Sequence, residues 1–169
     1  LWAYCRPTRL TTAGRGVHKL VTGIDREQSD KLALLHQLSA HILGSVAYQG
    51  GATGVDSSAE NAITAGAGVC QDHAHIFIAA CRSMGIPARY VSGYLMMDGQ
   101  VEQSASHAWA EAHVDAIGWV GFDISNGISP DGRYVRVATG FDYRDAAPIS
   151  GMSFGARDKS MVVSLRVEQ

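Results

Sequence analysis

The sequence predicts an α+β fold in which N-terminal helices pack on an antiparallel β-sheet. Three observations lead to this prediction. Apolar residues recur at helical spacing over 30–47 and again over 70–84. Residues 88–138 instead divide into short β-branched and aromatic runs separated by turn residues. Helices followed by a series of strands favour an α+β arrangement over alternating βαβ units.

The composition is that of one compact domain, with 169 residues, 46% hydrophobic residues, 18% charged residues and a net charge of −2. We therefore expect a single domain over 1–169. The weak net charge gives no reason to expect a nucleic-acid or membrane partner, and no apolar run approaches the length of a membrane span. Three cysteines are too few for a disulfide framework, so a cytoplasmic location is expected. The chain lacks an initiator methionine, which suggests a fragment or a processed form.

Capping residues set the limits of the first two predicted helices. Ser29 or Asp30 is a suitable N-cap for a helix over 30–47. The run Ser57-Ser58-Ala59-Glu60 matches a capping box, in which Glu60 is expected to reach back to the N-cap amide. The helix that follows is expected to span about 58–65.

The third predicted helix begins at Cys70, directly after a glycine-containing turn. Gly85 and Pro87 are expected to end this helix. The first turn of a helix carries unpaired N–H groups and a partial positive charge, which stabilise a thiolate. Cys70 is therefore the best candidate for a nucleophile.

The predicted strands follow the third helix, apart from one short strand near the N-terminus. The hairpin signal Asp98-Gly99 and the alternating pattern at the C-terminal end indicate antiparallel pairing. The expected strands cover residues 8–12, 88–96, 106–114, 119–124, 134–138 and 161–168, with a return strand at 101–102.

A nucleophilic thiol needs a base, and the base needs a group that orients it. His107 and Asp123 lie on neighbouring predicted strands, and a turn near Asp115 would place them almost opposite one another. The Cys70 thiolate would then attack a carbonyl carbon and form a thioester acyl-enzyme, with His107 as the base and Asp123 orienting it. Gln71 is a candidate oxyanion donor, together with the backbone N–H of Cys70.

Trp109 has two possible roles, because it flanks the same group of residues. We expect it either to pack in the sheet or to line the substrate cleft.

The motifs Gly68-Val69-Cys70-Gln71-Asp72, Gly85 to Tyr94, Ser106-His107-Ala108-Trp109 and Gly118 to Asp123 occur in an order that resembles the bacterial transglutaminase-like family, a distantly papain-like core. The resemblance covers about residues 30–145. It implies a Cys-His-Asp triad on Cys70, His107 and Asp123, with the cysteine at a helix N-terminus against an antiparallel sheet. It also implies that residues 1–12 are the remnant of a β-rich N-terminal region.

One departure from the family pattern follows the candidate aspartate. Asp123-Ile124-Ser125-Asn126 stands where relatives often have Asp-Pro-Thr-Asn. The loop after Asp123 is therefore expected to be held differently.

The expected function is that of a cysteine-dependent amide hydrolase acting on a peptide or protein amide, without a cofactor. Two alternatives are acyl transfer to an amine, as in a transglutaminase, and a non-catalytic binding module with the same fold. A metal site is a further possibility, because Cys70, Asp72, His73 and His75 are ligand types close in sequence. At about 100° per residue they scatter around a helix, so no metal site is expected.

The two histidines of this helix then need other roles. We expect His75 to contact Asp72. We expect His73 to form a wall of the cleft or to face solvent.

Overall fold

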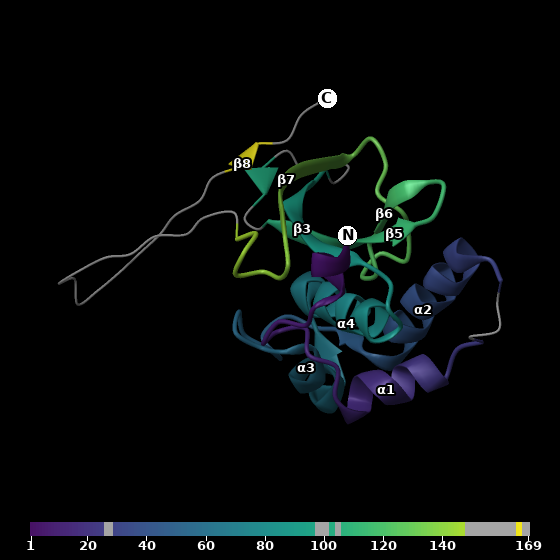
Figure 1. Ribbon diagram of the computed structural model, residues 1–169. Helices are drawn as coiled ribbons and strands as arrows, with labels where there is room; N and C mark the ends of the chain where they lie inside the picture. Colours follow the sequence, from purple (N-terminus) through teal and green to yellow (C-terminus); the bar gives the residue numbers. More distant parts are fainter. Residues whose placement is uncertain (26–28, 97–101, 104–105, 148–164, 167–169) are drawn as a thin grey trace.

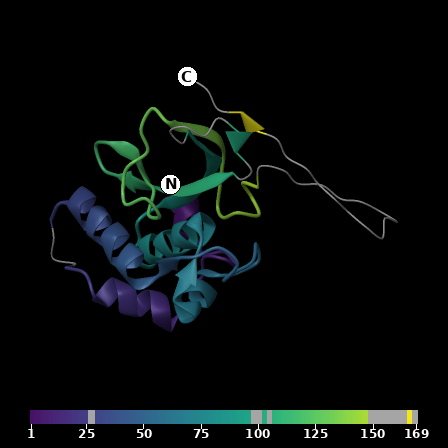
Figure 2. The same ribbon diagram turned by 180° about the vertical axis from the view of Figure 1, so that it is seen from behind.

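The computed structural model describes residues 1–25, 29–96, 102–103, 106–147 and 165–166, and it confirms the α+β fold class (Figure 1). Helices form one layer and a four-stranded sheet forms the other, in both views of the molecule (Figure 2). The helical segments are η1 (Trp2–Cys5), α1 (Arg15–Thr22), α2 (Lys31–Ser45), α3 (Ala59–Ala65) and α4 (Cys70–Ser83). None of the helices in the described ranges is long and apolar enough to cross a membrane.

The main sheet is antiparallel and has the strand order β6-β5-β3-β7. Its strands are β3 (Ala88–Leu95), β5 (His107–Val114), β6 (Gly118–Phe122) and β7 (Tyr134–Gly140). Two small sheets accompany it: β1 (Ala47–Tyr48) pairs with β2 (Ala67–Gly68), and β4 (Glu102–Gln103) pairs with β8 (Leu165–Arg166). The predicted C-terminal strand is thus seen in part, and the Asp98-Gly99 hairpin lies outside the described residues.

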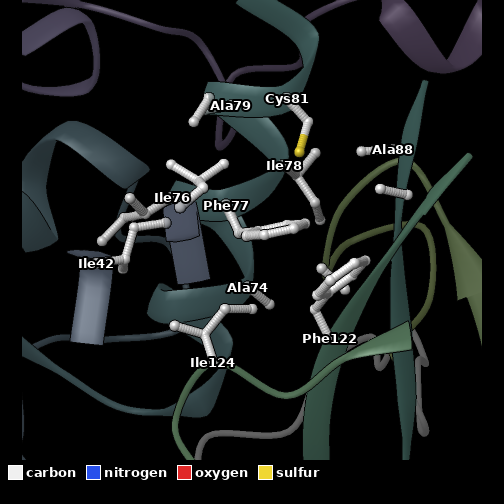
Figure 3. Packing of buried hydrophobic residues seen from close by; sticks show 14 of the residues in the cluster. Ile42, Ala74, Ile76, Phe77, Ile78, Ala79, Cys81, Ala88, Phe122 and Ile124 are labelled. Atoms are coloured by element: carbon white, nitrogen blue, oxygen red, sulfur yellow. The ribbon is translucent and has the colours of Figure 1, made fainter. Parts of the chain in front are cut away.

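Helix α4 lies between the other helices and the sheet, and nearly all of its residues are buried. On one side the Phe77 ring stacks on Phe122 with centroids 5.0 Å apart, and on the other side Ile76 points toward Ile42 (Figure 3). All four side chains are essentially fully buried. Burial of each such side chain contributes about 1.5–3 kcal/mol.

Alternation along β5 separates its two faces. Ala108, Ala110 and Ala112 belong to the core that β5 shares with α4, and their small side chains allow the helix to approach closely. The residues between them therefore point to the opposite face of the sheet. Both His107 and Trp109 lie on this outer face.

Local signals set the ends of two helices as predicted. The Asp30 carboxylate caps α2 by accepting hydrogen bonds from Leu32 N at 2.9 Å and Ala33 N at 3.3 Å. Beyond α4, Gly85 adopts a positive φ of 76°, a conformation that favours glycine.

The predicted role of Glu60 is wrong. Ser58 caps α3 together with Asn61, which supplies the returning side chain of the capping box. The Glu60 carboxylate instead accepts hydrogen bonds from three backbone N–H groups at the start of α1, at distances of 2.8–3.0 Å, from Gly14, Gly16 and Val17. These bonds satisfy N–H groups of α1 that have no partner within the helix.

The predicted strand over 8–12 is also absent from the structure. The segment is a turn, in which Thr8 and Thr11 bond to one another through their side chains. The buried Arg82 guanidinium donates to Thr11 Oγ1 at 2.6 Å and to the carbonyls of Tyr4 and Phe141. A buried cation satisfied by these oxygens therefore holds the N-terminal segment against α4 and the sheet.

Candidate active site

Cys70 is the first residue of α4, and the contacts of its neighbours Gly68 and Asp72 fix its position. The buried Asp72 carboxylate accepts from Val69 N at 2.8 Å and from Thr53 Oγ1 at 2.6 Å. A Cβ on Gly68 would lie 2.7 Å from Asp72 Cβ, so only glycine fits at this position. The cysteine remains partly exposed at the helix N-terminus.

The structure brings His107 together with both Cys70 and Asp123. His107 Nε2 lies 2.6 Å from Asp123 Oδ2. His107 and Cys70 line the same cavity, and the nearby Cys70 side chain contributes to raising the pKa of His107. Because Nε2 faces the aspartate, Nδ1 is the nitrogen available to the thiol.

Asp123 lies just beyond the end of β6 and is offset from His107 across the strand pair. The register pairs Ala110 with Phe122, so its continuation places Asp123 opposite Trp109. His107 is two residues from Trp109 and therefore on the same face of the sheet. The two side chains thus lie almost opposite one another, as expected, and meet in a diagonal contact.

Asp123 is fully buried and accepts further hydrogen bonds from two residues that the sequence did not identify. Asn126 Nδ2 and Tyr134 Oη both donate to Oδ2 at 2.7 Å, and Asn126 N donates to Oδ1 at 3.2 Å. Asn126 is the last residue of the Asp123-Ile124-Ser125-Asn126 motif and matches the asparagine of the family pattern. This match was a sequence signal for its role. Tyr134 begins β7, and its approach depends on a long-range strand pairing.

Electrostatics favour a charged pair between His107 and Asp123. Burial disfavours the imidazolium, but the hydrogen bond to Asp123 and the nearby Cys70 side chain outweigh it and raise the pKa of His107 to about 9. Burial also disfavours the Asp123 carboxylate, but its hydrogen bonds with His107, Asn126 and Tyr134 hold its pKa below the usual range. At neutral pH the site therefore contains an imidazolium beside a carboxylate.

A cavity of about 210 Å³ opens on Cys70 and His107. Its other walls are largely uncharged, and they include Val55, Gln71, Tyr90 and Tyr143. Val55 is 60% exposed, so one side of this cavity is an apolar surface open to solvent.

Gln71 and Trp109 take different places around the candidate nucleophile. The Gln71 side chain donates to the carbonyl of Val55 at 3.0 Å, so one of its N–H groups is directed away from the thiol. Trp109 is buried, and its ring centroid lies 6.2 Å from that of His107 and 5.4 Å from that of Tyr134. A Cβ on Gly93 would lie 2.6 Å from Trp109 Cη2, so this glycine makes room for the indole.

His73 neither faces solvent nor lines the cavity around Cys70, contrary to the prediction. It is fully buried, with Nε2 3.0 Å from the Val46 carbonyl and Nδ1 2.9 Å from Ser125 Oγ. Because a carbonyl can only accept, the proton is on Nε2 and the Ser125 hydroxyl donates to Nδ1. This bond connects the first turn of α4 to the loop that follows Asp123.

The predicted contact between His75 and Asp72 is also wrong. His75 Nε2 accepts from Tyr143 N at 3.2 Å, and its ring lies 5.1 Å from that of Tyr90. The side chain is fully buried, and burial lowers its pKa to about 4. His75 thus supports two tyrosines that line the cavity around Cys70.

The burial of His75 predicts a loss of stability in acid. Between about pH 7.5 and about pH 5 the unfolded chain protonates His75, whereas the folded chain, with a pKa of about 4, does not. The unfolded state therefore binds more protons, and the free energy of unfolding falls as the pH falls. His75→Gln keeps an acceptor for Tyr143 N–H but does not titrate. Urea unfolding should show that the wild type loses about 2 kcal/mol more than His75→Gln over this interval. Equal losses would contradict this role of His75.

No group of three or more histidine, cysteine, aspartate or glutamate side chains that could hold a metal ion occurs among the described residues. Asp72, His73 and His75 instead bond to separate partners, as described above.

A cysteine at the N-terminus of a central helix, with a histidine and an aspartate on the adjoining antiparallel sheet, defines a transglutaminase-like core. Residues 18–124 match the model of the Transglutaminase-like superfamily, and the chain belongs to this superfamily. The family resemblance read from the motifs is thus confirmed.

Two relatives and two solved structures illustrate the match. The chain is 42% identical over 125 residues to an uncharacterized protein of Mycobacterium leprae, covering 70% of this chain and 44% of the relative. It is 32% identical over 139 residues to an uncharacterized protein of Mycobacterium tuberculosis, covering 76% and 44%. The chain thus spans less than half the length of these curated relatives.

Among solved structures, a protein proposed to be a cysteine protease from Cytophaga hutchinsonii superposes with a TM-score of 0.77 at 29% identity, covering 99% of this chain and 56% of that one. The periplasmic domain of TgpA from Pseudomonas aeruginosa gives a TM-score of 0.53 at 22% identity, covering 75% and 49%. The second likeness concerns the fold alone.

Proposed function

We propose that the chain is a cysteine-dependent amide hydrolase that acts through Cys70, His107 and Asp123. The observation that carries the proposal is a row of side chains in which His107 bonds to the buried Asp123 at 2.6 Å and lines one cavity with Cys70. Such a row supplies a nucleophile, a proton carrier and an orienting carboxylate. The substrate class is a peptide or protein amide.

The proposed reaction has two steps. The Cys70 thiolate attacks the amide carbonyl carbon, the C–N bond breaks, and the amine leaves with the proton of the His107 imidazolium. Water then attacks the thioester carbon while His107 accepts a proton from it. The C–S bond breaks, the carboxylic acid is released, and the thiolate and imidazolium are restored. The first-turn N–H groups of α4 stabilise the oxyanion in both steps.

Access of water supports hydrolysis as the fate of the thioester. Cys70 and His107 are both partly exposed and line the same open cavity. Water is therefore able to reach an acyl group on Cys70, whereas transfer to an amine requires water to be excluded.

The proposal is tested by trapping the acyl-enzyme with 4-nitrophenyl acetate. We expect a burst of 4-nitrophenol and an acetyl group on Cys70 in peptide mass spectra. Cys70→Ala should abolish both, and Cys5→Ala, which removes the other partly exposed cysteine, should abolish neither. Turnover at the wild-type rate in Cys70→Ala would refute the mechanism.

A parallel reaction with added glycine ethyl ester separates the two fates of the thioester. Free acid as the main product supports hydrolysis. Amide as the main product supports acyl transfer.

A further inference from the structure

A second cavity, of about 400 Å³, lies on the outer face of the sheet, and two of its lining residues contact the candidate catalytic side chains. These two residues are Trp109 and Tyr134. The Tyr134 hydroxyl donates to Asp123, and the Trp109 ring packs beside His107. The other lining residues used below are Glu111, Trp119, Pro130 and Arg136.

The aromatic and proline walls of this cavity are firmly packed. The Arg89 guanidinium lies over the Trp119 ring at 4.2 Å from its centroid. The Pro130 ring packs on β6, where a Cβ on Gly121 would lie 2.9 Å from Pro130 Cδ. Trp109 is held over Gly93 as described above. The cavity thus presents flat apolar surfaces that are already in place to receive a ligand.

The charged side chains that line the cavity, together with the arginines paired to them, carry an excess of positive charge. The nearly buried Glu111 carboxylate is bonded by two arginines, with Arg89 at 2.6 Å and Arg136 at 2.9 Å. One carboxylate between two guanidinium groups leaves one positive charge. Asp131 at the cavity is already paired with Arg133 at 2.7 Å.

Arg136 is the cation best placed to meet a ligand. Its side chain is 54% exposed, and only one of its nitrogens is engaged, by Glu111, within the described part of the chain. Its remaining N–H groups form a planar fork that suits a carboxylate.

We propose that this cavity binds a peptide segment in which a carboxylate lies next to a flat apolar side chain. The carboxylate contacts Arg136, and the apolar side chain lies between Trp109, Trp119 and Pro130. The identification of this peptide segment as part of the substrate rests on the proposed amide hydrolysis. A substrate held there contacts Trp109 and Tyr134, and through them the His107–Asp123 pair. The cavity would therefore give a preference for acidic sequences near the cleaved bond.

The test measures binding in the Cys70→Ala protein, so it does not depend on turnover. The probe is the peptide acetyl-Phe-Asp-amide, and the readout is the NMR signals of the three tryptophan indole N–H groups. We expect saturable shifts of the Trp109 and Trp119 signals. The signal of Trp2, which does not line the cavity, should stay unchanged. The isosteric neutral peptide acetyl-Phe-Asn-amide should bind about tenfold more weakly, because it lacks the charge-assisted bonds.

Two arginine variants locate the charge. Arg136→Gln should weaken binding of the acidic peptide about tenfold. Arg9→Gln, which removes an exposed arginine paired with Asp56, should not change it. A second acidic probe, acetyl-Phe with a free carboxylate, distinguishes a terminal carboxylate from a side-chain carboxylate as the preferred ligand.

Three results would overturn the proposal: no saturable shift, equal binding of the acidic and neutral peptides, or an unchanged affinity in Arg136→Gln. The comparison of the two peptides uses no Arg136 variant, so it decides the matter even if Arg136→Gln does not fold. Binding without turnover by the wild type would refute the proposed hydrolysis but not the binding site. Turnover without binding would refute only the binding site.

Discussion

His107→Ala is expected to lower kcat/KM for amide hydrolysis by about 10³-fold or more. His107 bonds to the Asp123 carboxylate at 2.6 Å and lines the same cavity as Cys70. Its loss removes the proton donor for the leaving amine and the cation that stabilises the Cys70 thiolate. Alkylation of Cys70 by iodoacetamide near pH 7 should therefore slow together with turnover.

His113→Ala is the matched control for this prediction. His113 lies on the same strand and, by alternation, on the same face as His107, but its neighbours are Trp119 and Asp115. We expect His113→Ala to retain the wild-type rates of both hydrolysis and alkylation. Rapid alkylation of Cys70 in His107→Ala would show that the thiolate does not depend on this histidine.

The predicted parts of the fold depend on local signals. Asp30 caps its own helix within three residues, and Gly85 ends α4 through its own backbone conformation. Helix α1 was missed because its N-terminal cap comes from Glu60, which is 43 to 46 residues away in the sequence. A nearby capping pattern misled the prediction for Glu60, because Asn61 satisfies the same requirement from the adjacent position.

The residues of the candidate site also fall into two groups, those found from local motifs and those placed only by long-range strand pairing. Cys70, His107 and Asp123 were identified because each lies in a short motif, and the motifs occur in a consistent order. Tyr134 reaches Asp123 only because β7 pairs with β3 across a register shift between Ser92 and Gly93. Gly93 is a sequence signal for such a shift, but it does not identify the partner strand or the new register.

The loop after Asp123 is bonded to the helix that carries Cys70. Ile124 is buried in the core, and the Ser125 hydroxyl bonds to the buried His73 on the first turn of α4. The loop is therefore held to the nucleophile helix through a hydroxyl group, which a threonine at position 125 would also supply. Local sequence shows the departure at 124–125, but not the partner 52 residues away.

Asp123→Asn is expected to lower kcat by about 10²- to 10⁴-fold. Asp123 Oδ1 accepts from the backbone N–H of Asn126, a donor that cannot reverse its role. The new amide oxygen must therefore occupy this position, and the NH₂ group must take the place of Oδ2. It then faces His107 Nε2, which can only accept from it if the ring proton moves to Nδ1. A proton on Nδ1 faces Cys70, so the neutral ring can no longer accept the thiol proton.

Tyr134→Phe separates this tautomer effect from the loss of a hydrogen bond. It removes one donor to Asp123 Oδ2 but leaves the carboxylate charge and its bond to His107. We expect a smaller decrease in kcat, of about tenfold, because a hydrogen bond to a charged group contributes about 1.5–3 kcal/mol and the carboxylate keeps its bonds from His107 and Asn126. Measurement of kcat and KM for both variants decides the matter, since the effect of Asp123→Asn should fall on kcat. A wild-type kcat in Asp123→Asn would mean that the carboxylate does not set the tautomer of His107.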